Sequence, residues 1–480
     1  MDIEKLSCKR VLYWFEEISK IPRGSGNEKA ISDMLLAFAE ERGLYVRQDE
    51  ANNIIIKKNA SEGMESIPPV LIQGHMDMVC EKLPEVNHDF LTDPISLVYE
   101  GEFLRGEGTT LGADDGIAVA YALAILEDKS LKHPEIQVLI TTDEEVGMGG
   151  ATAVSCHDIT ARRVLNIDSE EEGIFTVGCA GGMKTTSAIP VEYEPTGSRE
   201  GVWLNIGGLM GGHSGVEINK ERANANKLLG IVLNELSGKL DIRVSSLFGG
   251  AKDNAIPRDS GCFIGLTPGA TENAQKVISD LEAALNKEFS PQGENISITL
   301  KPCENEPRVF TPDSFKRVIT AIMLMPNGVL SMDTRLNMPQ TSNNLGVIKT
   351  EEDKVYLTCA VRSTVISRKY QVYKSIKALT ELAGGLCEYK GNYPAWEYKT
   401  DSELLKQAVK IFKAQYGCEP KLETIHAGLE CGILAEKMPG SEMISFGPDI
   451  FDIHTPKERL NIPSTERTWE LIKSLLENLK

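Results

Sequence analysis

Four stretches of this 480-residue chain share one pattern, an apolar run that ends in acidic residues or histidine. Continuous apolar runs of this length are typical of strands buried on both faces of a parallel sheet. Ligand sites in such sheets lie at the carboxyl ends of the strands. The pattern therefore predicts an α/β fold with a polar site along one edge of a mostly parallel sheet. The runs are residues 70–73, 136–140, 164–167 and 443–446.

Apolar residues at helical spacing separate these runs. The clearest predicted helices are residues 116–129 and 404–416, and both lie between predicted strands. Alternation of strands with amphipathic helices predicts that helices cover both faces of the sheet.

The middle of the chain has a different pattern. Its strands alternate in polarity, as at 203–206 and 355–358, and amphipathic helices are predicted at 273–289 and 370–383. We therefore predict an inserted α+β domain at 183–388, between two parts of a catalytic domain at 1–182 and 389–480. The insert is long enough for two similar βαββαβ halves, which we place at 184–303 and 304–390. Charged, turn-rich segments at 192–201 and 304–313 are then expected to be a loop and an internal hinge.

Net charge restricts the partners of the chain. It has 51 Lys and Arg against 70 Asp and Glu, a formal charge of −19, whereas nucleic acids and anionic membranes require a positive surface.

The best uncharged apolar run, 118–126, is about half the length of a membrane span. The N-terminus lacks a secretory signal, and the ten cysteines include no Cys-x-x-Cys pair. We expect a soluble, cytoplasmic protein that binds neither nucleic acid nor membrane.

Two glycines near Ser25 allow two interpretations. A glycine pair before a helix is found in phosphate cradles, whereas Ser25 followed by Glu28 matches a helix capping box. We favour the capping box, because no apolar strand leads directly into the glycines.

The polar groups at the strand ends are individually weak signals. His75-x-Asp77 at the end of a strand is more often structural than catalytic, and one carboxylate of Asp114-Asp115 suffices to cap the following helix. A lone His454 in a turn is more often inert.

Three consecutive carboxylates, Asp143-Glu144-Glu145, add to this set. They are either a solvated turn or part of a concave site, where they would raise one another's pKa values unless a cation neutralised them. Together with Asp168, the strand ends offer two imidazoles and at least three carboxylates. Such a set without thiolates suits zinc, cobalt or manganese. Five ligands are too many for one open tetrahedral site and suit two ions with a water between them.

These motifs resemble the co-catalytic di-zinc exopeptidase family, which includes bacterial glutamate carboxypeptidase, tripeptidase T, aminoacylase and carnosine dipeptidase. The likeness covers essentially the whole chain. The amino-acid sequence at 75–82 and at 427–432 is similar to that of the cytosolic dipeptidases of this family. The matching motifs occur in the order of the family: Gly-His-Met-Asp at 74–77, Gly-Ala-Asp-Asp-Gly at 112–116, Asp-Glu-Glu at 143–145, Asp168 and His454.

The resemblance implies two divalent metal ions, zinc in the first place, with cobalt or manganese as alternatives. Asp114 is expected to bridge the ions. His75 and Asp168 would complete one site, and Glu145 and His454 the other. Two further residues would be catalytic: Asp77 would orient His75 through a hydrogen bond, and Glu144 would be the general base that takes the proton of the bridging water.

The resemblance also implies substrate contacts. His213 is expected to stabilise the oxyanion, although it also fits an inert loop histidine, and Arg362 to hold the terminal carboxylate. Asn254 is a candidate for the same pocket or simply a turn residue. Gly428 and Glu430 are expected at the substrate end.

The insert is about twice the length of a single lid. In simple members of the family the lid histidine reaches the active site of a neighbouring subunit. We therefore hypothesise that the second half of the insert replaces the lid of a partner, so that the active site is complete in one chain even if the protein forms a homodimer.

The activity expected from these implications is hydrolysis of dipeptides, including Xaa-His and β-alanyl-histidine. A deacylase of N-acyl amino acids would share every metal ligand, and a non-catalytic peptide- or metal-binding protein is a remoter alternative.

Overall fold

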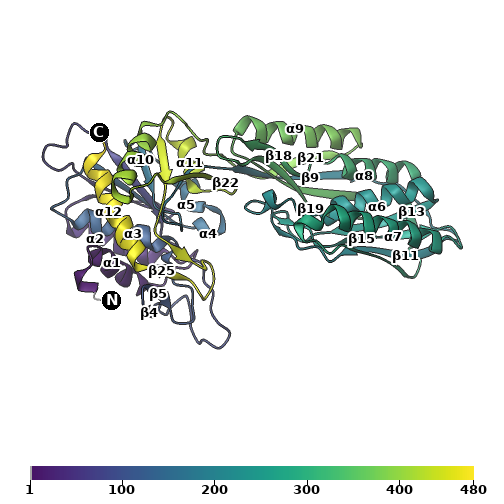
Figure 1. The fold of residues 1–480 in the computed structure, drawn as a ribbon, viewed down its shortest axis with the longest axis horizontal. Helices are drawn as coiled ribbons and strands as arrows, with labels where there is room; N and C mark the ends of the chain where they lie inside the picture. The colour runs from purple at the N-terminus through teal and green to yellow at the C-terminus, as the bar shows by residue number, and fades with distance from the viewer. Residues whose placement is uncertain (1–2) are drawn as a thin grey trace. The chain divides into compact units, whose positions relative to one another are not determined.

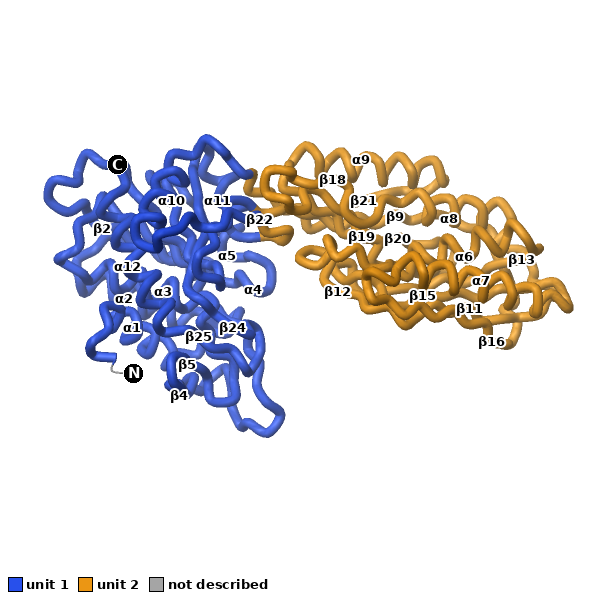
Figure 2. Tube along the Cα trace, in the orientation of Figure 1, with its two compact units in different colours: residues 1–178, 398–424, 429–480 blue, residues 179–397, 425–428 orange. Residues whose placement is uncertain are grey.

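The computed structural model describes residues 3–480, and the chain divides into two compact units. Unit 1 comprises Met1–Gly178, Tyr398–Thr424 and Leu429–Lys480. Unit 2 comprises Cys179–Glu397 and the short segment Ile425–Gly428 (Figure 2). Two of the crossings between the units lie close to the predicted boundaries at 182 and 388.

Unit 1 is built on an eight-stranded mixed sheet of order β1-β2-β6-β3-β7-β23-β8-β22. Figure 1 shows that the N-terminal part of the chain, in purple, and the C-terminal part, in yellow, both belong to this unit. Its four central strands are parallel and contain the four apolar runs. Every residue of β3 and β6 is buried, as expected for strands covered on both faces. The strands are β1 Tyr45–Gln48, β2 Ile54–Lys58, β3 Val70–His75, β6 Ile136–Thr141, β7 Arg163–Asn166, β8 Ile174–Cys179, β22 Lys421–Ile425 and β23 Glu442–Ser445.

Helices and a small second sheet complete unit 1. The predicted helices at 116–129 and 404–416 are present as α3 and α10, and α3 packs on β3. The helices are α1 Lys9–Ser19, α2 Lys29–Glu41, α3 Ala113–Glu127, α4 Glu144–Gly147, α5 Gly149–Ala153, α10 Glu403–Tyr416, α11 Glu430–Lys437 and α12 Ile462–Asn478. The second sheet has the order β24-β25-β5-β4, from Ile450–Phe451, Arg459–Asn461, Phe103–Gly106 and Leu97–Glu100.

Unit 2 is built on a nine-stranded sheet of order β16-β11-β15-β13-β19-β20-β9-β21, with β18 paired to β19. The helices and strands share one continuous apolar core. Its strands are β9 Gly181–Pro190, β11 Glu200–Gly207, β13 Ile242–Gly249, β15 Ser260–Leu266, β16 Ser297–Pro302, β18 Gly328–Asp333, β19 Met338–Glu351, β20 Lys354–Ser363 and β21 Leu386–Tyr393. Its helices are α6 Ala225–Lys239, α7 Thr271–Glu288, α8 Pro312–Leu324 and α9 Ile366–Leu382.

The sheet of unit 2 consists of two βαββαβ halves, as predicted, and the α/β class of the whole chain is confirmed. Strands β11, β13, β15 and β16 with α6 and α7 form one half, and β9, β19, β20 and β21 with α8 and α9 form the other. In each half the first strand lies between the third and the fourth.

The predicted boundary between the halves is wrong, because they are nested rather than consecutive. The outer half begins with β9, before the inner half, and resumes at α8. The segments predicted as a loop and a hinge contain β10 (Tyr193–Pro195) and β17 (Arg308–Phe310), which pair antiparallel. This ribbon holds together the two ends of the inner half. Alternating polarity identifies strands but not their partners, so the sequence could not reveal the nesting.

In the part of the chain that the structure describes, helices are too short or too polar to span a membrane.

Candidate metal centre

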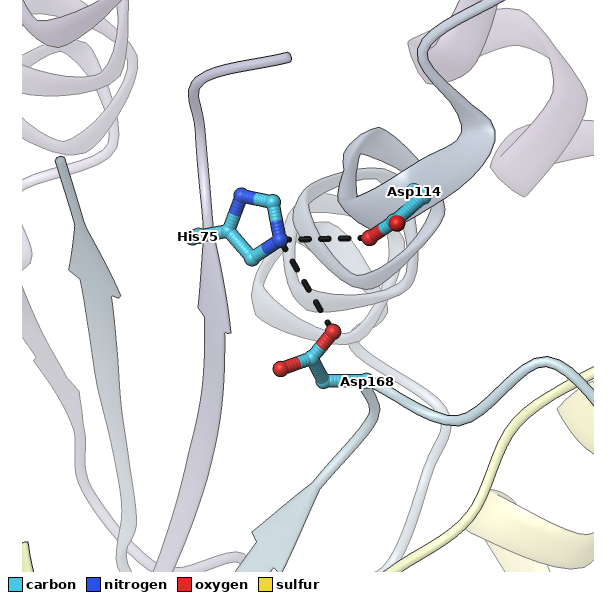
Figure 3. A group of neighbouring side chains, drawn as sticks. All are labelled: His75, Asp114 and Asp168. Carbon is cyan, nitrogen blue, oxygen red and sulfur yellow. Dashed lines mark hydrogen bonds and ion pairs between the residues drawn. The ribbon is translucent and has the colours of Figure 1, made fainter. Parts of the chain in front are cut away.

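The first group of candidate ligands joins three elements of unit 1. His75 is the last residue of β3, Asp114 lies in the first turn of α3, and Asp168 follows β7. The Nε2 atom of His75 lies 3.2 Å from Oδ1 of Asp114 and 3.7 Å from Oδ1 of Asp168 (Figure 3). The three side chains point toward one another at the carboxyl ends of two neighbouring parallel strands.

The second group shares Asp114 with the first. The Nε2 atom of His454 lies 3.0 Å from Oδ2 of Asp114 and 3.1 Å from Oε2 of Glu145. In each group, one ligand atom from each of the three residues lies within 4.8 Å of those of the other two. His454 has φ of 59°, in the left-handed region, which costs a non-glycine residue about 1–3 kcal/mol. The surrounding structure therefore holds this histidine in a conformation that it would not otherwise adopt.

Electrostatics at the shared carboxylate favour a bound cation. Burial opposes ionisation of Asp114, yet hydrogen bonds from His454 and His75 lower its pKa. Burial and the neighbouring acids raise the pKa of Asp168 well above its ordinary value. The Oε1 atom of Glu145 is buried and has no hydrogen-bond partner. Two imidazoles, three carboxylates and an unpartnered buried oxygen are a donor set that fits two divalent ions.

Glu144 lies beside the ligands without belonging to either group. It begins α4, directly after Asp143, whose φ of 56° is also left-handed. Burial raises the pKa of Glu144 to about 7, with the charge of Glu145 adding to this effect and that of His75 opposing it. A carboxyl group that titrates near neutral pH can both accept and donate a proton.

Asp77 supports both the histidine and the acidic turn. Its Oδ1 lies 3.3 Å from Nδ1 of His75. Its two carboxylate oxygens also accept hydrogen bonds from the backbone N–H groups of Glu144 and Glu145, at 3.1 and 3.3 Å. A single buried carboxylate therefore fixes the orientation of one candidate ligand and the backbone of another.

The capping box predicted from Ser25 and Glu28 is wrong. The hydroxyl of Ser25 donates to Oδ2 of Asp77 over 2.8 Å. Glu28 stands at the start of α2 and accepts from the backbone N–H groups of Gly26 and Asp143 instead. Both side chains have tertiary partners, which local spacing does not reveal.

Glu458 is a supporting residue that the sequence analysis missed. Its carboxylate accepts hydrogen bonds from the backbone N–H groups of Leu111, Gly112 and Ala113, at 2.8, 3.0 and 2.7 Å. It thereby fixes the loop that delivers Asp114. The only signal in the sequence is its position four residues after His454.

Arg23 is a second missed residue. It is 2% exposed, and its Nη1 donates to the backbone carbonyl of Met76 at 2.9 Å, while Nη2 donates to that of Gly112. The guanidinium thus ties the turn after His75 to the loop before Asp114.

Glu430 is the first residue of α11 and has no exposed surface. Its Oε2 accepts from Gln73 Nε2 and Thr141 Oγ1, both at 2.6 Å, and Gln73 in turn accepts from Asn166. Burial raises the pKa of Glu430 to about 8. These bonds join β3, β6 and β7 close to the metal ligands, because Gln73 stands two residues before His75 and opposite Asn166, and Thr141 stands opposite His75.

The other predicted substrate residues lie in unit 2. The Nδ1 atom of His213 accepts from the backbone N–H groups of Gly215 and Val216 at 3.3 Å, so its Nε2 carries the proton of the neutral ring. Arg362 and Asn254 line one cavity. Gly428 is half-buried in the short segment that also contains His426.

Comparisons with known proteins find relatives that match over the full length of the chain. The chain is 35% identical to the cytosol non-specific dipeptidase of Escherichia coli over 481 aligned residues, which cover 100% of this chain and 99% of that protein. The structure of aminoacylhistidine dipeptidase from Vibrio alginolyticus matches with a TM-score of 0.94 and 36% identity, over 100% of this chain and 98% of that one.

A more distant match shows the fold alone. The aminopeptidase PepT from Bacillus cereus has a TM-score of 0.59 and 15% identity, over 99% of both chains. The family model described as Peptidase family M20/M25/M40 matches residues 71–478, which include every candidate metal ligand. This chain therefore belongs to peptidase family M20/M25/M40.

Proposed function

We propose that the chain is a metal-dependent dipeptidase that hydrolyses the peptide bond of dipeptides, Xaa-His among them. The observation that carries the proposal is the pair of ligand groups that share Asp114, with Glu144 beside them. The names of the two relatives that match over the full chain support dipeptides as the substrate class. The word cytosol in one of these names supports a cytoplasmic location.

The ligand residues proposed for two divalent ions are those of the two groups. His75 and Asp168 would hold one ion, Glu145 and His454 the other, and Asp114 both. Zinc suits this mixture of nitrogen and oxygen ligands, and cobalt and manganese are alternatives. When bound, the two ions polarise the scissile carbonyl and lower the pKa of a water molecule.

Glu144 would take the proton from the attacking water and deliver it to the leaving amine. Its pKa near 7 matches this double task, since a group that titrates near the working pH is an efficient base and acid in turn. Asp77 would keep His75 in the tautomer whose Nε2 is free to bind a metal, because it faces Nδ1.

The substrate would be held by residues of unit 2. Arg362 would pair with the terminal carboxylate, and Asn254 lines the same cavity. The protonated Nε2 of His213 would donate to the developing oxyanion, and Gly428 would line the path of the peptide. We assign Glu430 to the support of the strands rather than to substrate contact, because it has no exposed surface.

The test is an assay of metal-depleted protein on a small dipeptide panel, with zinc, cobalt or manganese added back. We expect metal-dependent turnover, and we expect Glu144→Gln to lower kcat about 100- to 10,000-fold while two ions still bind. Glu171→Gln, an exposed acid close in sequence to Asp168, is the matched control. Turnover of N-acetyl-histidine but not of alanyl-histidine would establish a deacylase instead.

A further inference from the structure

The cavity that contains Arg362 is rich in positive charge. It has a volume of about 390 Å³ and lies entirely within unit 2. Arg362, Lys184 and Lys390 line it, and Asp253 is the only acidic residue among its lining residues. With Asp253 counted, these lining residues have a net charge of +2, so one terminal carboxylate would leave one positive charge unmatched.

The pairing of three strands explains how the charges come together. Arg362 on β20 stands opposite Gly182 on β9, and Gly182 stands opposite Tyr393 on β21. Residues opposite one another on neighbouring strands share a face of the sheet. Arg362 and Tyr393 therefore form one row across this face.

A second row lies two residues along β9. Ala360 stands opposite Lys184, and Lys184 stands opposite Lys390. Side chains two residues apart in a strand point to the same face, about 7 Å from one another. The two lysines thus lie on the same face as Arg362, and the small side chain of Ala360 leaves space in the row between them and β20.

The two lysines are an unfavourable pair by themselves. Like charges directly opposite each other on neighbouring strands destabilise a sheet. Asp253 offsets one of them, since its Oδ2 lies 3.7 Å from Nζ of Lys184. Across residues 3–480, no carboxylate forms an ion pair with Lys390. A cleft lined by charges of one sign concentrates ligands of the opposite sign, so the pair suits an anionic ligand.

We propose that Lys184 and Lys390 form a subsite for the side chain of the substrate's C-terminal residue, and that it selects aspartate or glutamate there. This inference rests on the proposed dipeptidase function and on Arg362 as the partner of the terminal carboxylate. With that carboxylate on Arg362, an acidic side chain carries its charge toward the lysine row. Among dipeptides, the preferred substrates are therefore those that end in an acidic residue.

The experiment compares kcat/KM for Ala-Glu and Ala-Gln, which have nearly the same size and differ in one charge. At low ionic strength we expect the metal-loaded protein to prefer Ala-Glu at least fivefold, through a lower KM. Lys390→Gln and the double variant Lys184→Gln/Lys390→Gln should bring the ratio toward one. Lys301→Gln changes an exposed lysine on β16, the opposite edge strand of the same sheet, and should leave the ratio unchanged.

Salt gives a second measurement that needs no variant. Partly exposed charges are screened within about 8 Å at 0.15 M salt, so the preference of the unmodified protein should shrink as sodium chloride is added. Equal rates for the two peptides, or a preference that the lysine variants and salt leave unchanged, would overturn the subsite. Cleavage of alanyl-histidine but of neither of these peptides would also overturn the subsite. Failure to hydrolyse any of the three with any metal would refute the dipeptidase function itself, so the two failures are distinguishable.

Discussion

The hydroxyl of Tyr393 accepts a hydrogen bond from Nη1 of Arg362 over 2.9 Å. Gly182 makes this contact possible, because a Cβ atom at that position would lie 2.4 Å from the tyrosine hydroxyl. The Nε atom of Arg362 is buried without a partner. One edge of the guanidinium is thus anchored by protein while other donors remain for a ligand.

Tyr393→Phe tests whether the hydroxyl positions Arg362. Hydrogen bonds to charged groups contribute about 1.5–3 kcal/mol, so we expect KM for dipeptides to rise about 10- to 100-fold with little change in kcat. A dipeptide amide lacks the terminal carboxylate and should show the same KM with both proteins. A fall in kcat that is equal for the peptide and its amide would contradict a positioning role.

Glu458→Gln tests the support of the loop that carries Asp114. The amide offers one oxygen instead of two to the backbone N–H groups, so at least one buried donor loses its partner. We expect metal affinity to fall about 10- to 100-fold, measured by titration of metal-free protein. Glu477→Gln, at an exposed position of α12, should have no effect.

Removal of metal should destabilise unit 1. The candidate ligands place three carboxylates and two imidazoles close together, and a ligand at 100 times its Kd stabilises a folded protein by about 2.7 kcal/mol. We expect chelation to lower Tm and each added equivalent of zinc, up to two, to raise it. In His454→Ala the second equivalent should have little effect. A Tm that does not respond to metal would contradict the assignment of the site.

His426 should make stability depend on pH. Burial, together with the charge of Arg362, lowers its pKa to about 3, and its Nε2 lies 2.7 Å from the hydroxyl of Ser342. Because the folded pKa lies below the unfolded value of about 6.5, its stabilising effect is complete above pH 6.5 and is lost as pH falls toward 3.

The variant His426→Gln isolates this effect from the titration of the metal site. Between pH 7.5 and 5, the free energy of unfolding of the original protein should fall by about 2 kcal/mol more than that of the variant. Denaturant unfolding of both proteins at the two pH values measures the difference. Parallel pH profiles would show that His426 titrates normally.

Mixing inactive subunits tests whether one chain holds a complete active site. His213→Ala and Glu144→Ala remove residues of different units. If the outer half of unit 2 replaces the lid of a partner, mixtures of the two proteins should stay inactive. Recovery of activity in mixed dimers would show that His213 acts in a neighbouring subunit.

The sequence by itself determined the fold class and the set of candidate ligands. Buried parallel strands require apolar residues on both faces, so the runs before His75 and Asp168 were visible as strands without any contact information. Parallel strands also place their carboxyl ends at one edge. His75 and Asp168 could therefore be expected together, although 93 residues separate them.

Only the tertiary structure decided which residues support the candidate ligands and how the strands of unit 2 pair. The nesting of the two halves of unit 2 depends on which strands pair, and strands with the same alternation can pair in several orders. Likewise Ser25, Arg23 and Glu458 form hydrogen bonds with partners distant in sequence. The residues next to them in the sequence do not indicate these partners. A hydrogen bond needs atoms within about 3 Å of each other, and such proximity arises only when the chain has folded.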